Sequence, residues 1–155
     1  MTTRRVLVAA AIGLLIFALY IRVRGARQPA FVADPIRTPG VLNAAVTQTN
    51  IRTTVCHPGW TRTVRPPTDY TNALKRRQMR AYRERGPMSA YQEDHLISLE
   101  LGGDPTDPRN LWPEPYPRAS DVDKIENELN AQVCSGALTL AQAQLKEAQL
   151  KHTQG

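Results

Sequence analysis

The chain has 155 residues, of which 41% are hydrophobic and 22% are charged, so it is expected to form one globular domain rather than a disordered or collagen-like chain. The formal net charge is +6, but five arginines and no acidic residue lie in residues 1–27. The remaining residues are therefore close to neutral, which excludes an argument from bulk charge to nucleic acid binding.

Residues 6–21 form an uncharged apolar run with arginines on both flanks. A helix that is apolar on every side and lies at the terminus does not fit a soluble core. The layout is typical of a signal peptide, and sixteen residues is somewhat short for a spanning helix of about 20. We expect residues 1–27 to be a signal peptide or a membrane anchor. The chain would be membrane-anchored and facing the extracytoplasmic side, or secreted or periplasmic. The flanking arginines leave the membrane orientation open.

Residues 28–41 contain three prolines and Gly40, which predicts a linker, and the folded domain is expected over residues 42–155. Cys56 and Cys134 are an even pair in a chain that has the features of an exported protein, so we predict a disulfide between them. Two buried free thiols are the alternative. Two cysteines do not suffice for a four-ligand zinc site.

The pattern around Ile51–Val55 predicts a strand, and residues 70–85 predict a helix with one apolar side. That helix is strongly basic: residues 52–85 carry a net charge of +7, whereas residues 86–155 carry −6. Such a face is often merely solvated, but its imbalance favours contact with phosphates. The residues expected to bind nucleic acid are Lys75, Arg76, Arg77, Arg80 and Arg83.

The second half of the chain predicts a hairpin and two helices. Residues 91–99 read as a strand, and residues 110–112 read as a short returning strand after a glycine turn. A helix is expected from about Asp121, with Ser120 as its N-cap and Gly136 at its end. A last helix is expected from residue 140 to about residue 150, capped by Thr139.

Polar side chains from this hairpin and helix could converge on one site that contains Asp94, His95, Asn110 and Asn130. An imidazole can take a proton from water near neutral pH. Carboxylate and amide oxygens are hard ligands that suit a magnesium-like ion. Such a set suits phosphodiester hydrolysis. Asp123 and Glu126 lie on the same side of the helix, and we interpret them as supporting charges.

The stretch EDHLISLELGGDPTDPRNLWPEP resembles the core of the HNH endonucleases, the His-Me finger or ββα-metal group. The resemblance is closest to small exported bacterial HNH-like proteins. It covers about residues 91–134, with a looser similarity upstream that includes Cys56, Trp60 and the segment from Arg65 to Lys75. It implies an α+β fold with a ββα-metal core and additional helices, preceded here by the N-terminal hydrophobic helix.

The resemblance also implies roles for individual residues. His95 would be the general base, Asp94 would bind the metal, and Asn110 would orient the His95 ring. The third motif position normally carries histidine, and Asn130 is expected to take that place as a metal ligand. The implied cofactor is one divalent metal ion, with Mg²⁺ favoured over Mn²⁺ or Zn²⁺.

The expected function is therefore a metal-dependent endonuclease that acts on DNA, with RNA as an alternative substrate. A catalytically inactive exported module that keeps the fold and binds nucleic acid or an envelope surface is the main alternative, and the asparagine at the third position favours it. An envelope protein whose basic helix meets anionic lipid is a further alternative.

Overall fold

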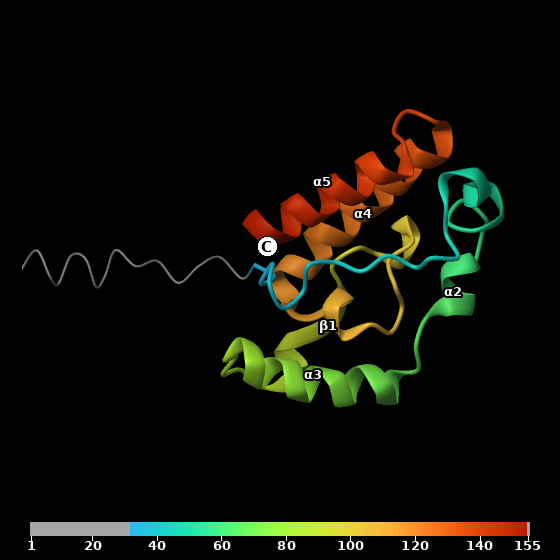
Figure 1. Cartoon of the computed structure of the whole chain (residues 1–155). Coiled ribbons are helices and arrows are strands. Elements are labelled where there is room, and N and C mark those ends of the chain that lie inside the picture. The colour runs from blue at the N-terminus through green and yellow to red at the C-terminus, as the bar shows by residue number, and fades with distance from the viewer. Residues whose placement is uncertain (1–31, 155) are drawn as a thin grey trace, which may run out of the picture. The chain divides into compact units, whose positions relative to one another are not determined.

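A computed structural model describes residues 32–154, which belong to one compact unit, Phe31–Gly155. The predicted leader or anchor and residues 28–31 of the predicted linker lie outside the described residues. The fold is α+β, as predicted, and comprises a two-stranded antiparallel sheet and several helices (Figure 1). None of the helices between residues 32 and 154 has the length and apolar character needed to span a membrane.

The sheet is a hairpin of β1 (Tyr91–His95) and β2 (Leu111–Pro115), in which His95 pairs with Leu111. The Leu96 amide donates to the Asn110 carbonyl. This bond determines which residue pairs of the hairpin are hydrogen-bonded and which are not, because the two kinds alternate along an antiparallel ladder. Both prolines of β2 then fall at positions whose N–H is not required by the ladder. The returning strand is confirmed, and the first strand is shorter than expected because the chain turns away after His95.

The hairpin lies between helices. α3 (Thr68–Tyr82) covers one side of it, and α4 (Tyr116–Ser135) lies on the other, next to α5 (Leu140–Thr153) (Figure 1). β2 leads directly into α4, so the order is strand, strand, helix. The smaller elements are α2 (Trp60–Val64) and the 3-10 turns η1 (Gln48–Thr53), η2 (Met88–Ala90), η3 (Leu99–Leu101) and η4 (Pro108–Asn110).

The main core lies between α4, α5, η1 and the loop that follows β1. The predicted apolar stripe of α4 supplies Leu129 and Val133, which pack against Ile97, Leu101 and other buried aliphatic side chains. Gly136 ends α4 in the left-handed conformation, as predicted. Thr139 caps α5 through a bond from the Gln142 amide, also as predicted. These helices fix the wall that faces the end of β1.

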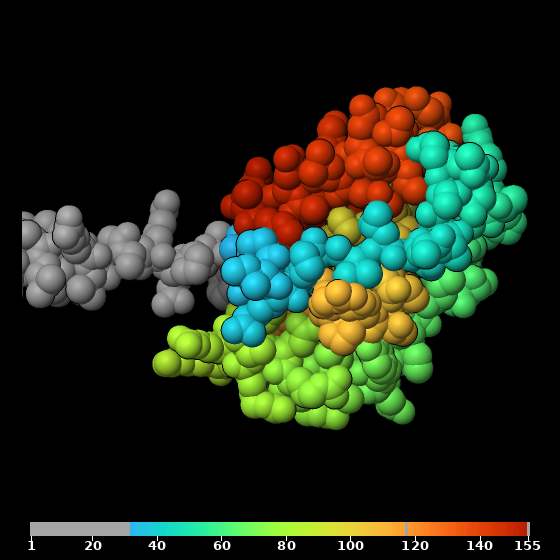
Figure 2. All heavy atoms as spheres, viewed as in Figure 1, coloured from blue at the N-terminus to red at the C-terminus, as the bar shows by residue number. Residues whose placement is uncertain are grey.

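Residues 32–41 pack against the domain instead of extending away from it as a linker would. Ala33 and Thr38 are completely buried. The Ala33 amide donates to the Lys151 carbonyl, and the Thr38 carbonyl lies 2.9 Å from Nε2 of His152. Figure 2 shows this N-terminal segment, in blue and cyan, lying across the surface between α5 and α3.

Two element predictions are wrong. Residues 48–53 form η1 rather than a strand, because the Asn50 side chain accepts from the Thr47 amide and donates to the Ala45 carbonyl, which closes a local turn. α4 begins at Tyr116, not near Asp121, and Ser120 lies inside it. The helix begins earlier because the first helical turn has no N–H bonds for its proline to break.

Candidate functional site

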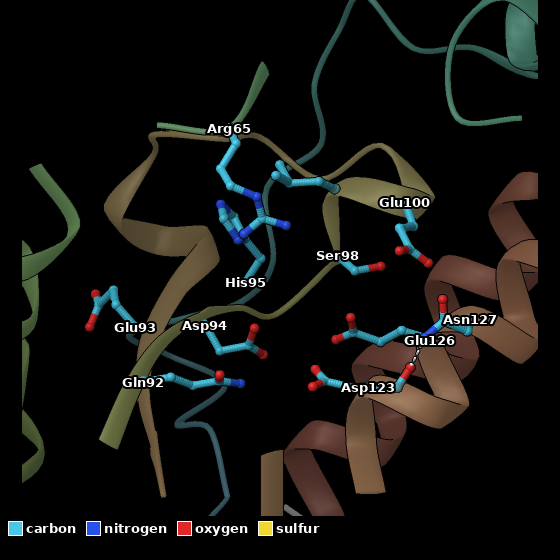
Figure 3. Close-up of a pocket in the computed structure, with 11 residues that line it drawn as sticks. Arg65, Gln92, Glu93, Asp94, His95, Ser98, Glu100, Asp123, Glu126 and Asn127 are labelled. Atoms are coloured by element: carbon cyan, nitrogen blue, oxygen red, sulfur yellow. Dashed lines mark hydrogen bonds between the residues drawn. The ribbon is translucent and has the colours of Figure 1, made fainter. Parts of the chain in front are cut away.

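A pocket of about 350 Å³ opens at the end of β1, between the hairpin, α4 and the chain that follows α2. Figure 3 shows Asp94 facing Asp123 and Glu126 across this pocket, with Arg65 and His95 at one side. The pocket is lined by Arg65, Gln92, Glu93, Asp94, His95, Ser98, Leu99, Glu100, Asp123, Glu126 and Asn127.

His95 is the last residue of β1 and is only 6% exposed. Its Nε2 atom lies 3.1 Å from the carbonyl oxygen of Pro105. Because a carbonyl only accepts, Nε2 carries the proton and Nδ1 is left as the basic nitrogen. Burial lowers the pKa of His95 below its usual value, so the ring is neutral near neutral pH. The residue is thus held in the form that a general base requires.

Asn110 is completely buried, but it has no hydrogen bond with the His95 ring. Its side-chain oxygen accepts from the Ile97 amide at 3.0 Å, and its Nδ2 donates to the carbonyls of Ile97 and Asp104. Asn110 therefore stabilises the loop after β1, and the carbonyl of Pro105 in this loop contacts the histidine. The orienting role expected for Asn110 would therefore have to act through the loop, because the two side chains share no direct bond.

Gly103 closes the same loop. A Cβ atom on Gly103 would lie 1.8 Å from the Ile97 carbonyl oxygen and 2.7 Å from Nδ2 of Asn110. No side chain fits there without displacing the backbone, so the second glycine of the GG pair permits the contact between the loop and Asn110.

Asp94 points into the pocket from β1 and is bound from behind by a buried lysine. Nζ of Lys151, on α5, lies 2.7 Å from Oδ2 of Asp94 and 2.5 Å from Oε1 of Glu126. Burial alone would lower the pKa of Lys151, but Asp94, Glu126 and Glu147 raise it well above its ordinary value. The lysine is thus a charged ammonium beneath the pocket. No local sequence pattern distinguishes Lys151 as a site residue.

Asn130 does not line the pocket. Its Nδ2 donates to the carbonyl oxygens of Val55 and Glu100, so its amide joins α4 to η1 and η3. One turn earlier on α4, Asp123 and Asn127 line the pocket instead. Helical spacing placed residues 123, 126 and 130 on one side of the helix, but it did not show which turn of α4 lies opposite β1.

Arg65 is a site residue that the sequence analysis did not assign. It follows α2 with extended backbone, and its guanidinium extends toward His95 (Figure 3). Pro66 and Pro67 separate it from α3, which keeps this stretch extended. The signal was its place in the looser upstream similarity, and the position of its side chain depends on long-range packing.

The pocket is rich in carboxyl groups that resist ionisation. Burial raises the pKa of Glu93 to about 8, and it also raises the pKa values of Glu100 and Asp123. The pKa of Glu114, on β2, is raised to about 7 by burial and by the charge of Asp94. A bound cation would favour the charged form of these groups.

The donor set fits a magnesium-like ion better than a zinc ion. Among residues 32–154, no three His, Cys, Asp or Glu side chains converge closely enough to hold a metal by themselves. Mg²⁺ commonly uses only one or two carboxylates and completes its shell with waters and substrate phosphates. Asp94 and Asp123, on opposite walls of the pocket, and the Asn127 amide offer such oxygens.

Of the five basic side chains that were expected to bind nucleic acid, four are exposed and one is buried. Arg76, Arg77, Arg80 and Arg83 are exposed. Lys75 is only 9% exposed, and its ammonium donates to the Tyr91 carbonyl at 2.8 Å. Lys75 therefore attaches α3 to β1 and is not available to a nucleic acid backbone.

The predicted disulfide between Cys56 and Cys134 is present, with a Cα–Cα distance of 5.6 Å. It connects the segment after η1 to the last turn of α4. This is the segment whose Val55 carbonyl accepts from Asn130. The disulfide and this hydrogen bond together attach the segment before α2 to α4.

Comparison of the chain with protein-family models, with curated proteins and with solved structures finds no match in any of the three.

Proposed function

We propose that this protein is a metal-dependent endonuclease of the HNH type, which hydrolyses phosphodiester bonds in DNA. The observation that carries the proposal is the pairing of His95 and Asp94 at the end of β1, in one pocket with Arg65 and the oxygens of α4. A neutral histidine with a free Nδ1 supplies the base, and the acidic wall supplies ligands for a cation. RNA is the alternative substrate.

His95 accepts a proton from a water molecule at Nδ1, while the Pro105 carbonyl holds the ring through Nε2. Asp94 and Asp123, with the Asn127 amide, would hold the metal ion. When bound, a Mg²⁺ ion supplies positive charge to the phosphate and to the leaving oxygen. Arg65 binds a phosphate oxygen of the same group through its guanidinium, whose planar donor geometry suits phosphate.

The exposed arginines of α3 bind the nucleic acid backbone in this proposal. Phosphate contacts fix the position of a duplex but do not read its sequence, so we expect little sequence preference from this helix. We also propose that the domain acts outside the cytoplasm, because the chain starts with an apolar segment and contains a disulfide.

The first test is cleavage of supercoiled plasmid by the full-length chain in EDTA, Mg²⁺, Mn²⁺ and Zn²⁺. We expect cleavage only with a divalent metal. His95→Ala should reduce the cleavage rate about 100- to 10,000-fold, because it removes the base, and should leave DNA binding nearly unchanged. The matched control is His57→Ala, which changes an exposed histidine away from the pocket.

Equal cleavage by His95→Ala and His57→Ala would contradict the assignment of the base. A folded protein that binds DNA but cleaves with none of the metals would instead favour the inactive binding module. Binding to anionic vesicles that persists in excess DNA would favour the envelope alternative.

A further inference from the structure

The ammonium of Lys151 connects three elements at a point that no solvent reaches. The side chain is 0% exposed and comes from the last turn of α5. Its Nζ atom contacts Oδ2 of Asp94, Oε1 of Glu126 and the backbone carbonyl of His95, at 2.7, 2.5 and 2.5 Å. It therefore binds the end of β1 to α4.

More carboxyl groups than ammonium groups meet at this point. Oε1 of Glu147, one turn earlier on α5, lies 3.6 Å from Nζ. Both carboxylate oxygens of Glu147 also accept from the Ser98 amide. Three carboxylates thus share one ammonium. In the part of the chain that the structure covers, Lys151 is the only basic side chain within ion-pair distance of Asp94, Glu126 or Glu147.

The lysine uses only one oxygen of each pocket carboxylate. Oδ1 of Asp94 and Oε2 of Glu126 accept no hydrogen bond from residues 32–154, and both side chains line the pocket. The Ser98 hydroxyl, on a residue that is 4% exposed, also lines the pocket and has no partner there. The pocket wall therefore carries several oxygens that are fixed in place but not satisfied.

We infer that Lys151 is a resident cation of this site, which positions Asp94 and Glu126 and leaves only their pocket-facing oxygens to a divalent ion. A metal ion would otherwise be drawn to the centre of these carboxylates, where the ammonium lies. The inference deepens the proposed function and rests on it, because Asp94 is one of the carboxylates that would hold the catalytic ion and Glu126 lines the same pocket.

The test replaces Lys151 with methionine, which has similar length and no charge. The carboxylates then lack a counter-ion, so we expect Mn²⁺ to bind at least about tenfold more tightly than to the wild-type chain. We also expect thermal stability to fall without metal and to recover with Mn²⁺. Binding is measured by the electron paramagnetic resonance of free Mn²⁺, and stability by thermal unfolding, on the full-length protein.

Three variants make the result specific. Lys146→Met removes an exposed lysine of the same helix and should leave Mn²⁺ affinity unchanged. Lys151→Arg keeps the charge and should retain the metal dependence of the wild type. Lys151→Met combined with Glu147→Gln removes one carboxylate with the lysine, which gives a folded protein if the single variant is too unstable.

Tighter binding, or folding that requires Mn²⁺, supports the inference. Mn²⁺ affinity equal to that of Lys146→Met overturns it, as does a variant that stays unfolded at every Mn²⁺ concentration while Lys151→Arg folds. Neither measurement involves cleavage. If the chain does not cut DNA, the proposed function is contradicted, but the Mn²⁺ measurements still test the role of Lys151.

Discussion

Asp123 and Asn130 lie seven positions apart on α4, and only Asp123 reaches the pocket. Asp123 faces Asp94 across the pocket, whereas the Asn130 amide is used by two backbone carbonyls. The two residues therefore have different surroundings, one in the pocket and one in the packing of α4 against η1 and η3, although the sequence placed both on the same helix face.

We predict that Asp123→Ala weakens Mg²⁺ or Mn²⁺ binding at least about tenfold and changes stability little, because Asp123 is exposed to the pocket. Asn130→Ala should do the reverse and destabilise the fold by about 1–3 kcal/mol, because it leaves buried carbonyls without donors. Calorimetric titration with metal and unfolding in urea separate the two. Normal metal binding by Asp123→Ala would contradict the ligand assignment.

The sequence predicted part of this site because part of it is local. Asp94 and His95 are adjacent, and the loop that ends at Asn110 returns within fifteen residues of His95. Lys151 lies 57 positions from Asp94. On a helix rich in Gln, Lys and Glu it had the pattern of a solvated residue, so only the packing of α5 reveals its contacts.

At the scale of elements, predictions succeeded where periodicity and end signals agreed. α5 has a capping threonine and α4 ends at a glycine, and both boundaries were found. η1 was missed because β-branched residues favour strands only when a neighbouring strand is present, and no strand within residues 32–154 pairs with residues 48–53. Its Thr and Asn side chains close a turn instead.

The disulfide gives an element-scale prediction. It closes a loop across a separation of 78 residues, so replacing Cys56 and Cys134 together with serine should cost about 4 kcal/mol of unfolding free energy. The measurement is urea unfolding of the oxidised chain, the reduced chain and the double variant. The reduced chain should match the variant, and a loss below about 1 kcal/mol would contradict the expected bracing role.

The molecule as a whole separates its charges. Several exposed arginines lie on or directly after α3, while five carboxyl groups line the pocket between β1 and α4. The near-neutral sum over residues 28–155 conceals this distribution, which the charge count along the chain had indicated. The basic face supplies attraction to a polyanion, and the acidic pocket requires a cation to receive it.

We predict that DNA affinity falls steeply with salt and that the exposed arginines determine the slope. Each arginine that contacts a phosphate of B-DNA contributes about 0.9 to the slope of log affinity against log salt. Arg76→Gln with Arg80→Gln should therefore lower the slope by up to about 1.8. The control is Lys146→Gln on α5, and fluorescence anisotropy at several salt concentrations measures both.

An unchanged slope in the double arginine variant would show that α3 does not contact the backbone, whatever the cleavage results.

The position of Lys151 also sets an order of assembly. The carboxylates of Asp94 and Glu126 precede it in the chain, so during synthesis they exist before their counter-ion does. Buried carboxylates without a partner are strongly destabilising, so the wall between β1 and α4 cannot close until the last turn of α5 docks. We therefore expect a chain that ends before residue 151 to lack a stable pocket wall.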